Sequence, residues 1–398
     1  MTSSPEAVAL PNPPNDGITS LQYIEENATS NNSGNNNNNN QKSLLASTSW
    51  DGALRLHDTA AKSHVLTHAM ECGPLLCMAA GSGGGGKLYT GGSDGSIRQF
   101  DIVTSSASLI GMHCCSNNDD KKAACSTLST INNSSSLIAS AGWDAKFHLW
   151  DVRLSSTNSS DKKPVVTLDL PGKAFSMDTS MDGTKVVVAT SGRKNCFIDI
   201  RSPTSLTATD NTDAEATSSK ENPPLAKNIL VRDSSLKYQT RCIKFFQPYS
   251  YGVAIGSIEG RVAIEYLSDI GISPPPPSLS TTAASPLNTK KYAFKCHRVN
   301  DIIYPVNDIA FHPIHGTFAT GGADGTVVTW DGNNKKKIAN IVKLQNSIAC
   351  LAYNFDGSEL AMASSYTFEE GERDHPREEI YVREVLESEV KPKVVVAK

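Results

Sequence analysis

Hydrophobic and polar positions follow one short pattern that returns along the chain. A small residue and a polar turn precede two or three apolar positions that alternate with polar ones, and an aromatic residue or Ile followed by an acid usually closes the unit. The six clearest copies are 50–58, 91–101, 141–151, 191–200, 256–266 and 321–331. Alternation with a period of two, as at Val327 and Thr329, is typical of a strand with one buried face. Three copies contain Asp-Gly, a strong hairpin-turn signal because Gly tolerates positive φ. The pattern therefore predicts repeated β-hairpins.

The spacing of these copies predicts a circular array. The closing Asp recurs at intervals of roughly 40–50 residues, which matches the period and the Trp-Asp ending of a WD-repeat propeller blade. The long gaps on either side of 256–266 contain low-complexity sequence. A further unit is predicted at 347–365 with a third strand at 380–385, and the first blade begins at 17–24. We therefore predict an all-β protein, a single seven-bladed WD-repeat β-propeller over residues 1–398.

A propeller ring must close, because an open edge strand invites aggregation. We expect residues 6–10 to supply the outer strand of the last blade, and residues 394–398 are the alternative. Stretches rich in Asn, Ser, Gly or Pro cannot bury enough apolar surface to offset chain entropy, so we predict them to be loop insertions. These insertions cover about 27–41, 81–86, 154–163, 202–223 and 272–289.

Composition narrows the choice of partners. The chain has 37 Lys and Arg against 41 Asp and Glu, a net charge of −4. Bulk binding of nucleic acid rests on a basic surface, so we do not expect nucleic acid among the partners. Binding of ubiquitin is not expected either. The nine Cys contain no CxxC pair and are interpreted as small buried hydrophobic residues. We see no secretory signal and no apolar run of membrane-spanning length, which predicts a reduced cytosolic or nuclear protein without a membrane partner.

Two segments resemble motifs of catalytic or metal sites, but each lacks a residue that the motif requires. The segment 81–88 resembles a phosphate-binding loop, but Leu88 stands where that loop needs Ser or Thr, and a strand rather than a helix follows. His312 and His315 have the spacing of metal ligands but no third ligand nearby, so an inter-strand turn is the better interpretation. We therefore expect no catalytic residue, no metal and no cofactor. A rigid ring of sheets without such chemistry is best interpreted as a binding platform whose loops carry the function.

One region is denser in chemistry than an ordinary blade. The segments 234–246, 256–267 and 290–298 bring Arg241, Arg261 and Lys295 to the ends of neighbouring strands. Several cations that converge on one face would suit an anionic ligand such as a phosphorylated or acidic peptide. The alternative is that each cation pairs with a nearby acid on a wet surface, and those acids are Glu259, Glu265 and Asp269.

The same segments, together with 304–331 and 364–385, resemble the spindle-checkpoint WD-repeat adaptors, the Bub-three family. The resemblance implies a propeller without enzymatic activity that binds phosphorylated Met-Glu-Leu-Thr-type motifs of the kinetochore scaffold. It also implies binding of a GLEBS-type segment of the checkpoint kinases. By motif match, Arg241, Arg261 and Lys295 are the implied cationic contacts and Trp50 the apolar anchor, with Glu259 a weaker candidate as an acceptor. Packing within the blade is the rival interpretation of Trp50, and Trp143 in the matching AGWD of another blade has the same ambiguity.

The resemblance further implies a monomeric propeller that works within hetero-complexes, in the nucleus, at kinetochores in mitosis and also in the cytoplasm. Its paralogue, the mRNA-export WD-repeat adaptor at nuclear pores, shares the segments SIEGRVAI and FKCHR and is the alternative function. A scaffold subunit of an unrelated complex, such as a ubiquitin ligase, is a third hypothesis. The insertions at 202–223 and 272–289 flank the candidate site and depart from the family pattern.

Overall fold

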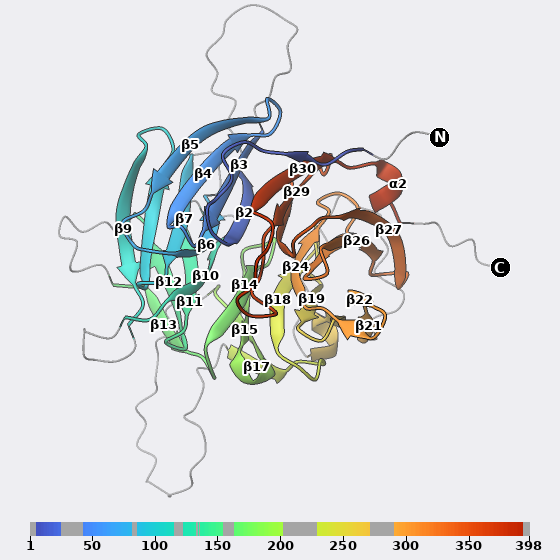
Figure 1. Cartoon of the computed structure of the whole chain (residues 1–398). Helices are drawn as coiled ribbons and strands as arrows, with labels where there is room; N and C mark the ends of the chain where they lie inside the picture. Colours follow the sequence, from blue (N-terminus) through green and yellow to red (C-terminus); the bar gives the residue numbers. More distant parts are fainter. Residues whose placement is uncertain are drawn as a thin grey trace, which may run out of the picture.

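The chain folds into a closed ring of seven four-stranded antiparallel sheets, or blades. The computed structural model describes residues 5–24, 43–81, 86–114, 122–132, 134, 136–153, 163–201, 229–270 and 290–392, without the side chains of 269 and 270. Figure 1 shows the sheets following one another around the ring in chain order, with the first strand beside the last. The predicted seven-bladed propeller is confirmed.

Each of the first four blades is formed by four consecutive strands, counted from the innermost outward. Blade one has β2 (Ile18–Ile24), β3 (Leu44–Ser49), β4 (Ala53–Asp58) and β5 (Ser63–Ala69). Blade two has β6 (Leu75–Ala80), β7 (Lys87–Gly92), β8 (Ser96–Asp101) and β9 (Ser106–Met112). Blade three has β10 (Cys125–Thr130), β11 (Leu137–Gly142), β12 (Lys146–Asp151) and β13 (Val166–Asp169). Blade four has β14 (Ala174–Thr179), β15 (Lys185–Thr190), β16 (Lys194–Asp199) and β17 (Ile229–Asp233), with a 3₁₀ turn at Ser191–Arg193.

The other three blades complete the ring, and the last takes its outer strand from the N-terminus. Blade five has β18 (Thr240–Phe245), β19 (Gly252–Ser257), β20 (Arg261–Tyr266) and β21 (Tyr292–Lys295), with a 3₁₀ turn at Leu267–Ile270. Blade six has β24 (Val306–Phe311), β25 (Phe318–Gly322), β26 (Thr326–Asp331) and β27 (Lys336–Lys343). Blade seven has β28 (Ile348–Tyr353), β29 (Glu359–Ser364), β30 (Glu379–Glu384) and β1 (Val8–Ala9). A small hairpin, β22 (Arg298–Val299) and β23 (Ile302–Ile303), stands between blades five and six, and α2 (Glu387–Val390) follows the last strand.

The core lies between neighbouring blades. Leu54 and Leu56 of blade one, for example, belong to one buried cluster with Leu75 and Phe100 of blade two. The buried face predicted at Val327 and Thr329 is confirmed, and in the middle strands the opposite face is buried as well. Val327 is fully buried and Val328, which points to the opposite face, is 6% exposed. The reason is that each middle strand is covered by a blade on both sides, so apolar and small polar residues alternate without either facing water.

The ring closes through its N-terminal strand, as predicted for residues 6–10. Val8 pairs with Val382 and Ala9 with Tyr381, antiparallel, in blade seven. The alternative closing segment, 394–398, lies outside the described residues. The predicted insertions at 27–41, 202–223 and 272–289 also lie outside them, as do 82–85 and 154–162 of the other two. Among the helices that the structure describes, none is long and apolar enough to cross a membrane.

Every innermost strand carries the same irregularity at its second residue. The register with the next strand shifts there in all seven blades, at Thr19, Leu76, Ser126, Phe175, Arg241, Asn307 and Ala349. Such a bulge re-aims one side chain and increases the local twist. The polar members use it to join the blades: Thr19 donates to Leu75 O at 2.9 Å and Ser126 to Ala174 O at 2.8 Å.

Candidate functional site

The five predicted site residues lie at one end of their blades. In blade five, Thr240 pairs with Ser257, Ser257 with Arg261, and Arg261 with Lys295. In blade one, the end of β3 pairs with the start of β2, and Trp50 follows directly in the turn to β4. Because all blades have the same strand order from the centre outward, these ends share one face of the ring. We call it the turn face, since the turns between the second and third strands lie on it.

Arg241 occupies the bulge position of blade five. The equivalent Asn307 of blade six donates to Ile348 O at 3.0 Å and so bonds the next blade. Arg241 has no ion pair with any carboxylate that the structure describes, and it is exposed. The bulge therefore presents a free guanidinium at the inner rim of the turn face.

A pocket of about 510 Å³ opens beside Arg241. Its apolar wall consists of Ile258, Ile302, Ile303 and Phe368, all of them 41–66% exposed. On the blade-seven side, the loop between β29 and β30 contributes Glu369 and Glu370. Glu369 accepts from Ser347 at 2.6 Å and from Thr367 at 2.8 Å, so its carboxylate is held in place. The pocket thus offers an apolar surface with a cation at one side and acids at the other.

Asn307 is a polar residue in the lining of this pocket. The side chain is 7% exposed, and its Oδ1 has no hydrogen-bond partner in the described structure. The side-chain amide serves the joint between blades six and seven, through its hydrogen bond to Ile348 O. Sequence analysis missed Asn307, as it missed Phe368 and the 302–303 hairpin, because only the folded ring brings them beside Arg241.

Arg261 and Lys295 are neighbours across β20 and β21. Arg261 Nε lies 3.4 Å from Glu259 Oε2, so the hypothesis that a nearby acid pairs with the cation holds for this residue. Lys295 is exposed and has no ion pair within the described residues. Glu259 therefore orients Arg261, and its predicted role as an acceptor for a peptide stays a prediction. Glu265 is buried and accepts from Ser235 N at 3.1 Å, and the side chain of Asp269 is outside the described structure.

Trp50 is 46% exposed, so its indole does not pack within the blade. The turn that carries it is rigid. Asp51 accepts from Arg55 Nη2 at 2.7 Å and from the backbone N–H groups of Asn15 and Ala53. Burial of Asp51 acts against its charge, but these hydrogen bonds outweigh it and lower the pKa of Asp51 to about 2. The indole is therefore held on the turn face as an apolar platform, and Trp143 is exposed to a similar degree, 41%.

A cluster in blade three contains the residue types of a metal site, but its side chains hydrogen-bond one another. His113, Asp144 and His148 could place ligand atoms within 4.8 Å of one another. However, His113 bonds Asp144 at 2.9 Å through Nδ1 and Ser140 at 2.9 Å through Nε2, and Trp150 donates to Ser140. Blade six repeats this chain with His297, Asp324, Thr320 and Trp330. The cluster is therefore a structural hydrogen-bond chain that fixes the blade.

The other candidates for chemistry are structural as well. His312 is buried, and its Nδ1 accepts from the backbone N–H groups of Ile314 and His315, which confirms the predicted turn. Burial and the neighbouring His315 lower the pKa of His312 to about 4. Eight of the nine Cys are described; seven of them are free and buried, and Cys114 is partly exposed. Cys115 lies outside the described residues.

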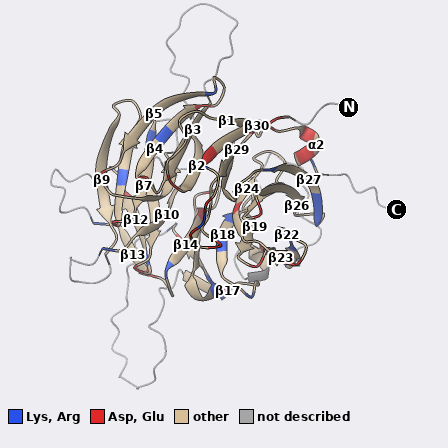
Figure 2. Cartoon of the chain, in the orientation of Figure 1, with Lys and Arg blue, Asp and Glu red and all other residues tan. Residues whose placement is uncertain are grey.

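Charged residues of both signs are spread over the blades that the structure describes, and Figure 2 shows them interspersed. An anionic ligand would therefore be attracted by local groups rather than by an extended basic surface.

The family model for the WD domain, G-beta repeat, matches residues 288–331. With the seven-sheet ring, this match defines the class: the chain is a WD-repeat β-propeller. It is 37% identical to mitotic checkpoint protein BUB3.1 of Arabidopsis thaliana, over 96% of this chain and 94% of the relative. It is 34% identical to mitotic checkpoint protein bub3 of Dictyostelium discoideum, over 95% and 94%. The Poly(A)+ RNA export protein of Schizosaccharomyces pombe is 27% identical over 97% and 92%. The chain belongs to the Bub3 family of mitotic checkpoint proteins.

Proposed function

We propose that this protein is a non-enzymatic adaptor of the mitotic spindle checkpoint. It binds phosphorylated Met-Glu-Leu-Thr-type motifs of the kinetochore scaffold and a GLEBS-type segment of checkpoint kinases, and so recruits the kinases to kinetochores. It acts as a single propeller over residues 1–398, with insertions that lengthen its loops, in the nucleus, at mitotic kinetochores and in the cytoplasm. The single observation that supports this best is the pair of cations without carboxylate partners, Arg241 and Lys295, on the face that also exposes Trp50.

The chemistry of a phosphorylated ligand fits these groups. A phosphothreonine carries about −1.5 to −2 charges and three strong acceptor oxygens. Arg241 can grip such a group with two parallel hydrogen bonds, whereas Lys295 and the Glu259-oriented Arg261 add point charge. Because Arg241 and Lys295 have no carboxylate partner in the described structure, a phosphate competes only with water for them. Trp50 supplies a large apolar contact of the kind that dominates interface energetics.

The pocket beside Arg241 suits an extended or helical segment with apolar side chains. Ile258, Ile302 and Phe368 present apolar surface, and Arg241 stands beside them as a cation. We assign this pocket to the GLEBS-type segment of the kinases. Isolated exposed apolar residues need no explanation on a protein surface, but several around one concave site favour a docking role.

The test is binding of fluorescent Met-Glu-Leu-Thr-type peptides, with and without phosphate on Thr, measured by anisotropy. Each charged hydrogen bond contributes about 1.5–3 kcal/mol, so we expect Arg241→Glu and Lys295→Glu each to weaken binding of the phosphopeptide at least ten-fold. The matched control is Lys343→Glu, because exposed Lys343 ends the outer strand of blade six as Lys295 ends that of blade five. It should change affinity by less than two-fold. Equal affinity for the two peptides in the wild type would overturn the proposal.

The export adaptor is the second candidate, because the similarity to a Poly(A)+ RNA export protein covers 92% of that relative. It predicts ligand binding that is indifferent to phosphorylation. A pull-down from drug-arrested mitotic cells separates the two functions. Capture of checkpoint kinases by the wild type, reduced by Arg241→Glu, supports the checkpoint role, and capture of nucleoporins alone supports export.

A further inference from the structure

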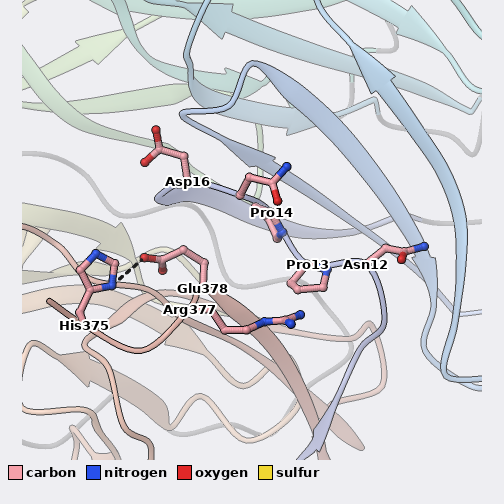
Figure 3. Close-up of a pocket in the computed structure, with 8 residues that line it drawn as sticks. Asn12, Pro13, Pro14, Asp16, His375, Arg377 and Glu378 are labelled. Carbon is pink, nitrogen blue, oxygen red and sulfur yellow. Dashed lines mark ion pairs between the residues drawn. The ribbon is translucent and has the colours of Figure 1, made fainter.

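The turn face has a second hollow, of about 530 Å³, at the junction of blades seven and one, but the acid inside it already has partners. Figure 3 shows the Glu378 carboxylate turned toward His375, and the two side chains lie 3.5 Å apart. Tyr366 N donates to the same carboxylate at 3.2 Å. The charge of Glu378 is therefore met within this hollow. On the other face of the ring, by contrast, exposed apolar and basic side chains gather.

The face of the ring opposite the turn face carries the turns between the first and second strands and those between the third and fourth, because the strands of each blade alternate in direction. In blades four to seven, which are consecutive, the turn between the first and second strands exposes an apolar side chain. These side chains are 36–62% exposed, and we call them the apolar arc: Met181, Tyr249, Ile314 and Phe355. Blades one to three have sequence rich in Asn, Ser or Gly in the same turns. The arc therefore belongs to one half of the ring.

The four turns of the apolar arc are joined to one another. Met181 N donates to Ser250 Oγ at 2.8 Å, which ties the turn of blade four to that of blade five. A Cβ on Gly316 in the blade-six turn would stand 3.0 Å from a backbone carbonyl of the blade-five turn. A Cβ on Gly357 in the blade-seven turn would stand 2.2 Å from His312 Nε2 in the blade-six turn. The arc is therefore continuous and formed before any partner binds, and a preformed surface loses little conformational freedom on binding.

A group of lysines lies beside the arc, where blades five and six meet on the same face. Tyr251 OH donates to Asn333 Oδ1 at 3.2 Å, which joins the blade-five turn of the arc to the turn between β26 and β27. Lys335 Nζ of that turn lies 4.7 Å from the centroid of the Tyr292 ring at the start of β21. The exposed lysines around these contacts are the lysine group: Lys290, Lys291, Lys335, Lys336 and Lys337.

The lysine group has little acid of its own to balance it. No ion pair with a described carboxylate involves Lys290 or the three lysines of blade six. Asp331, which pairs with Lys336 across β26 and β27, is buried, and its carboxylate accepts from the N–H of Asn334 at 3.0 Å and from Asn334 Nδ2 at 2.7 Å. Adjacent like charges repel one another, and an acidic partner relieves that repulsion. The lysine group is therefore complementary in charge to carboxylates or phosphates.

Two acids in the turns of the arc decide which kind of partner fits. Asp182 follows Met181, and Asp356 follows Phe355. A nucleic-acid strand laid along the arc would bring its regularly spaced phosphates against both acids. A peptide can instead place apolar side chains on the arc and its own acids on the lysine side only. The surface therefore favours a protein segment with both apolar and acidic side chains.

We propose that the apolar arc and the lysine group together form a docking surface for a segment of another protein that combines Leu or Ile with Asp or Glu. Isolated exposed apolar residues are ordinary, but a row of them on adjoining turns marks an interaction site. The surface lies on the face opposite the one assigned to the phosphorylated motif and the kinases, so it does not depend on the proposed function. Both faces can be occupied at once.

The first experiment measures binding of a fluorescein-labelled peptide of three Leu-Glu-Glu-Leu units to the full chain by anisotropy. We expect saturable binding that weakens at least ten-fold when Ile314→Ser and Phe355→Ser are combined, and at least five-fold when Lys335→Glu and Lys336→Glu are combined. The control Val103→Ser removes an 85% exposed apolar side chain from the same face outside the arc. Val103→Ser should bind within two-fold of the wild type, as should Lys343→Glu, at the other end of β27. Melting temperatures check that every variant folds.

Three results of this titration would overturn the docking surface. They are the lack of saturable binding by the wild type, an equal loss in Val103→Ser, and equal affinity for a peptide of Leu-Lys-Lys-Leu units. A twelve-nucleotide uridine RNA should bind at least ten-fold more weakly than the acidic peptide. Equal affinity for the RNA would assign the lysines to nucleic acid instead.

The second experiment tests the face and the occupant. Unlabelled Met-Glu-Leu-phosphothreonine peptide should not displace the acidic probe, and displacement would place the probe on the turn face and refute the proposal. Failure of the phosphopeptide to bind at all would refute the proposed function and leave this surface. Sedimentation equilibrium should show the same mass per particle for the wild type and the Ile314→Ser, Phe355→Ser variant. A wild-type dimer that the variant loses would assign the arc to a second copy, and ten-fold tighter probe binding after removal of residues 393–398 would assign it to the chain's own end.

Discussion

At the scale of single residues, the bulge in each innermost strand carries a side chain that joins two blades in some blades and is exposed in another. Thr19, Ser126 and Asn307 use it to hydrogen-bond the next blade. Arg241 stands at the same position in blade five and is not tied to a carboxylate there. The same backbone geometry therefore builds the ring in three blades and exposes a cation in another. This is why we expect changes at Arg241 to affect ligand binding far more than stability.

The Trp50 turn yields a prediction about pH. The pKa of Asp51 is about 2 in the folded protein, below its ordinary value. A carboxyl with a depressed pKa stabilises the fold above its unfolded pKa, and this stabilisation is lost as pH falls through the folded pKa. Asp51→Asn should therefore lower the free energy of unfolding by about 2 kcal/mol at pH 7. The difference should shrink below pH 4 and disappear near pH 2.

Melting temperatures of the wild type and Asp51→Asn at pH 7, 5, 4 and 3 would measure this effect. Asp94, in the matching turn of blade two, has no ion pair within the described residues, so Asp94→Asn is the control and should cost less than about 1 kcal/mol at pH 7. If the gap for Asp51→Asn stayed constant from pH 7 to pH 3, the ion pair with Arg55 would not be its source.

At the scale of elements, innermost strands are joined by side chains that accept backbone hydrogen bonds from the next blade. Gln22 accepts from Ala80 N at 2.9 Å, Asp178 from Phe245 N at 2.7 Å and Asp308 from Leu351 N at 2.8 Å. Lys244 lies between the last two carboxylates in the ring, with Asp178 at 3.9 Å. The first strands therefore form a continuous inner wall rather than seven separate edges.

Asp308→Ala tests this inner wall. The substitution leaves the N–H of Leu351 without its acceptor, and a buried unpaired donor costs about 1–3 kcal/mol. We expect a melting temperature several degrees below the wild type, and less than half that loss in Asp308→Asn, which keeps an acceptor. Asp169→Ala serves as the control, because its carboxylate is 83% exposed on an outer strand. Similar losses in Asp308→Ala and Asp169→Ala would count against a role in joining blades.

The repeats made the elements predictable from sequence, because alternation and Asp-Gly turns are local signals. The predicted first strand at 17–24 and third strand at 380–385 agree with β2 and β30 to within one residue. The arrangement around Arg241 was only partly predictable. Arg261 and Lys295 could be found from strand ends, but Asn307 and Phe368 come from blades six and seven and meet Arg241 only when the ring closes. Such contacts depend on the curvature of the whole array, which no local pattern encodes.

At the scale of the whole molecule, one buried arginine, Arg383, bonds both the segment before β1 and the helix after β30. Arg383 of β30 is 2% exposed and lies 2.8 Å from each carboxylate oxygen of Glu389 in α2. Its Nε also donates to Pro5 O at 2.9 Å, just before β1. Thr329 of blade six donates to Glu389 O at 2.7 Å, so the short helix is also tied to the neighbouring blade. The closing strand and the C-terminal helix therefore stabilise each other.

Glu389→Ala removes the partner of Arg383 and should lower the free energy of unfolding more than a substitution at an exposed residue does. Removing one partner of a buried pair leaves an uncompensated charge, which costs about 3–5 kcal/mol. Glu387→Ala, on the same helix, removes an exposed carboxylate paired with Lys391 and should leave the stability close to that of the wild type. Thermal unfolding together with amide exchange at Val8 and Ala9 would measure both effects, because loss of the pair between Arg383 and Glu389 should first expose the pairing between β1 and β30. If Glu389→Ala lowered stability without faster exchange in β1, the two termini would not be coupled through Arg383, and closure of the ring would rest on the strand pairing alone.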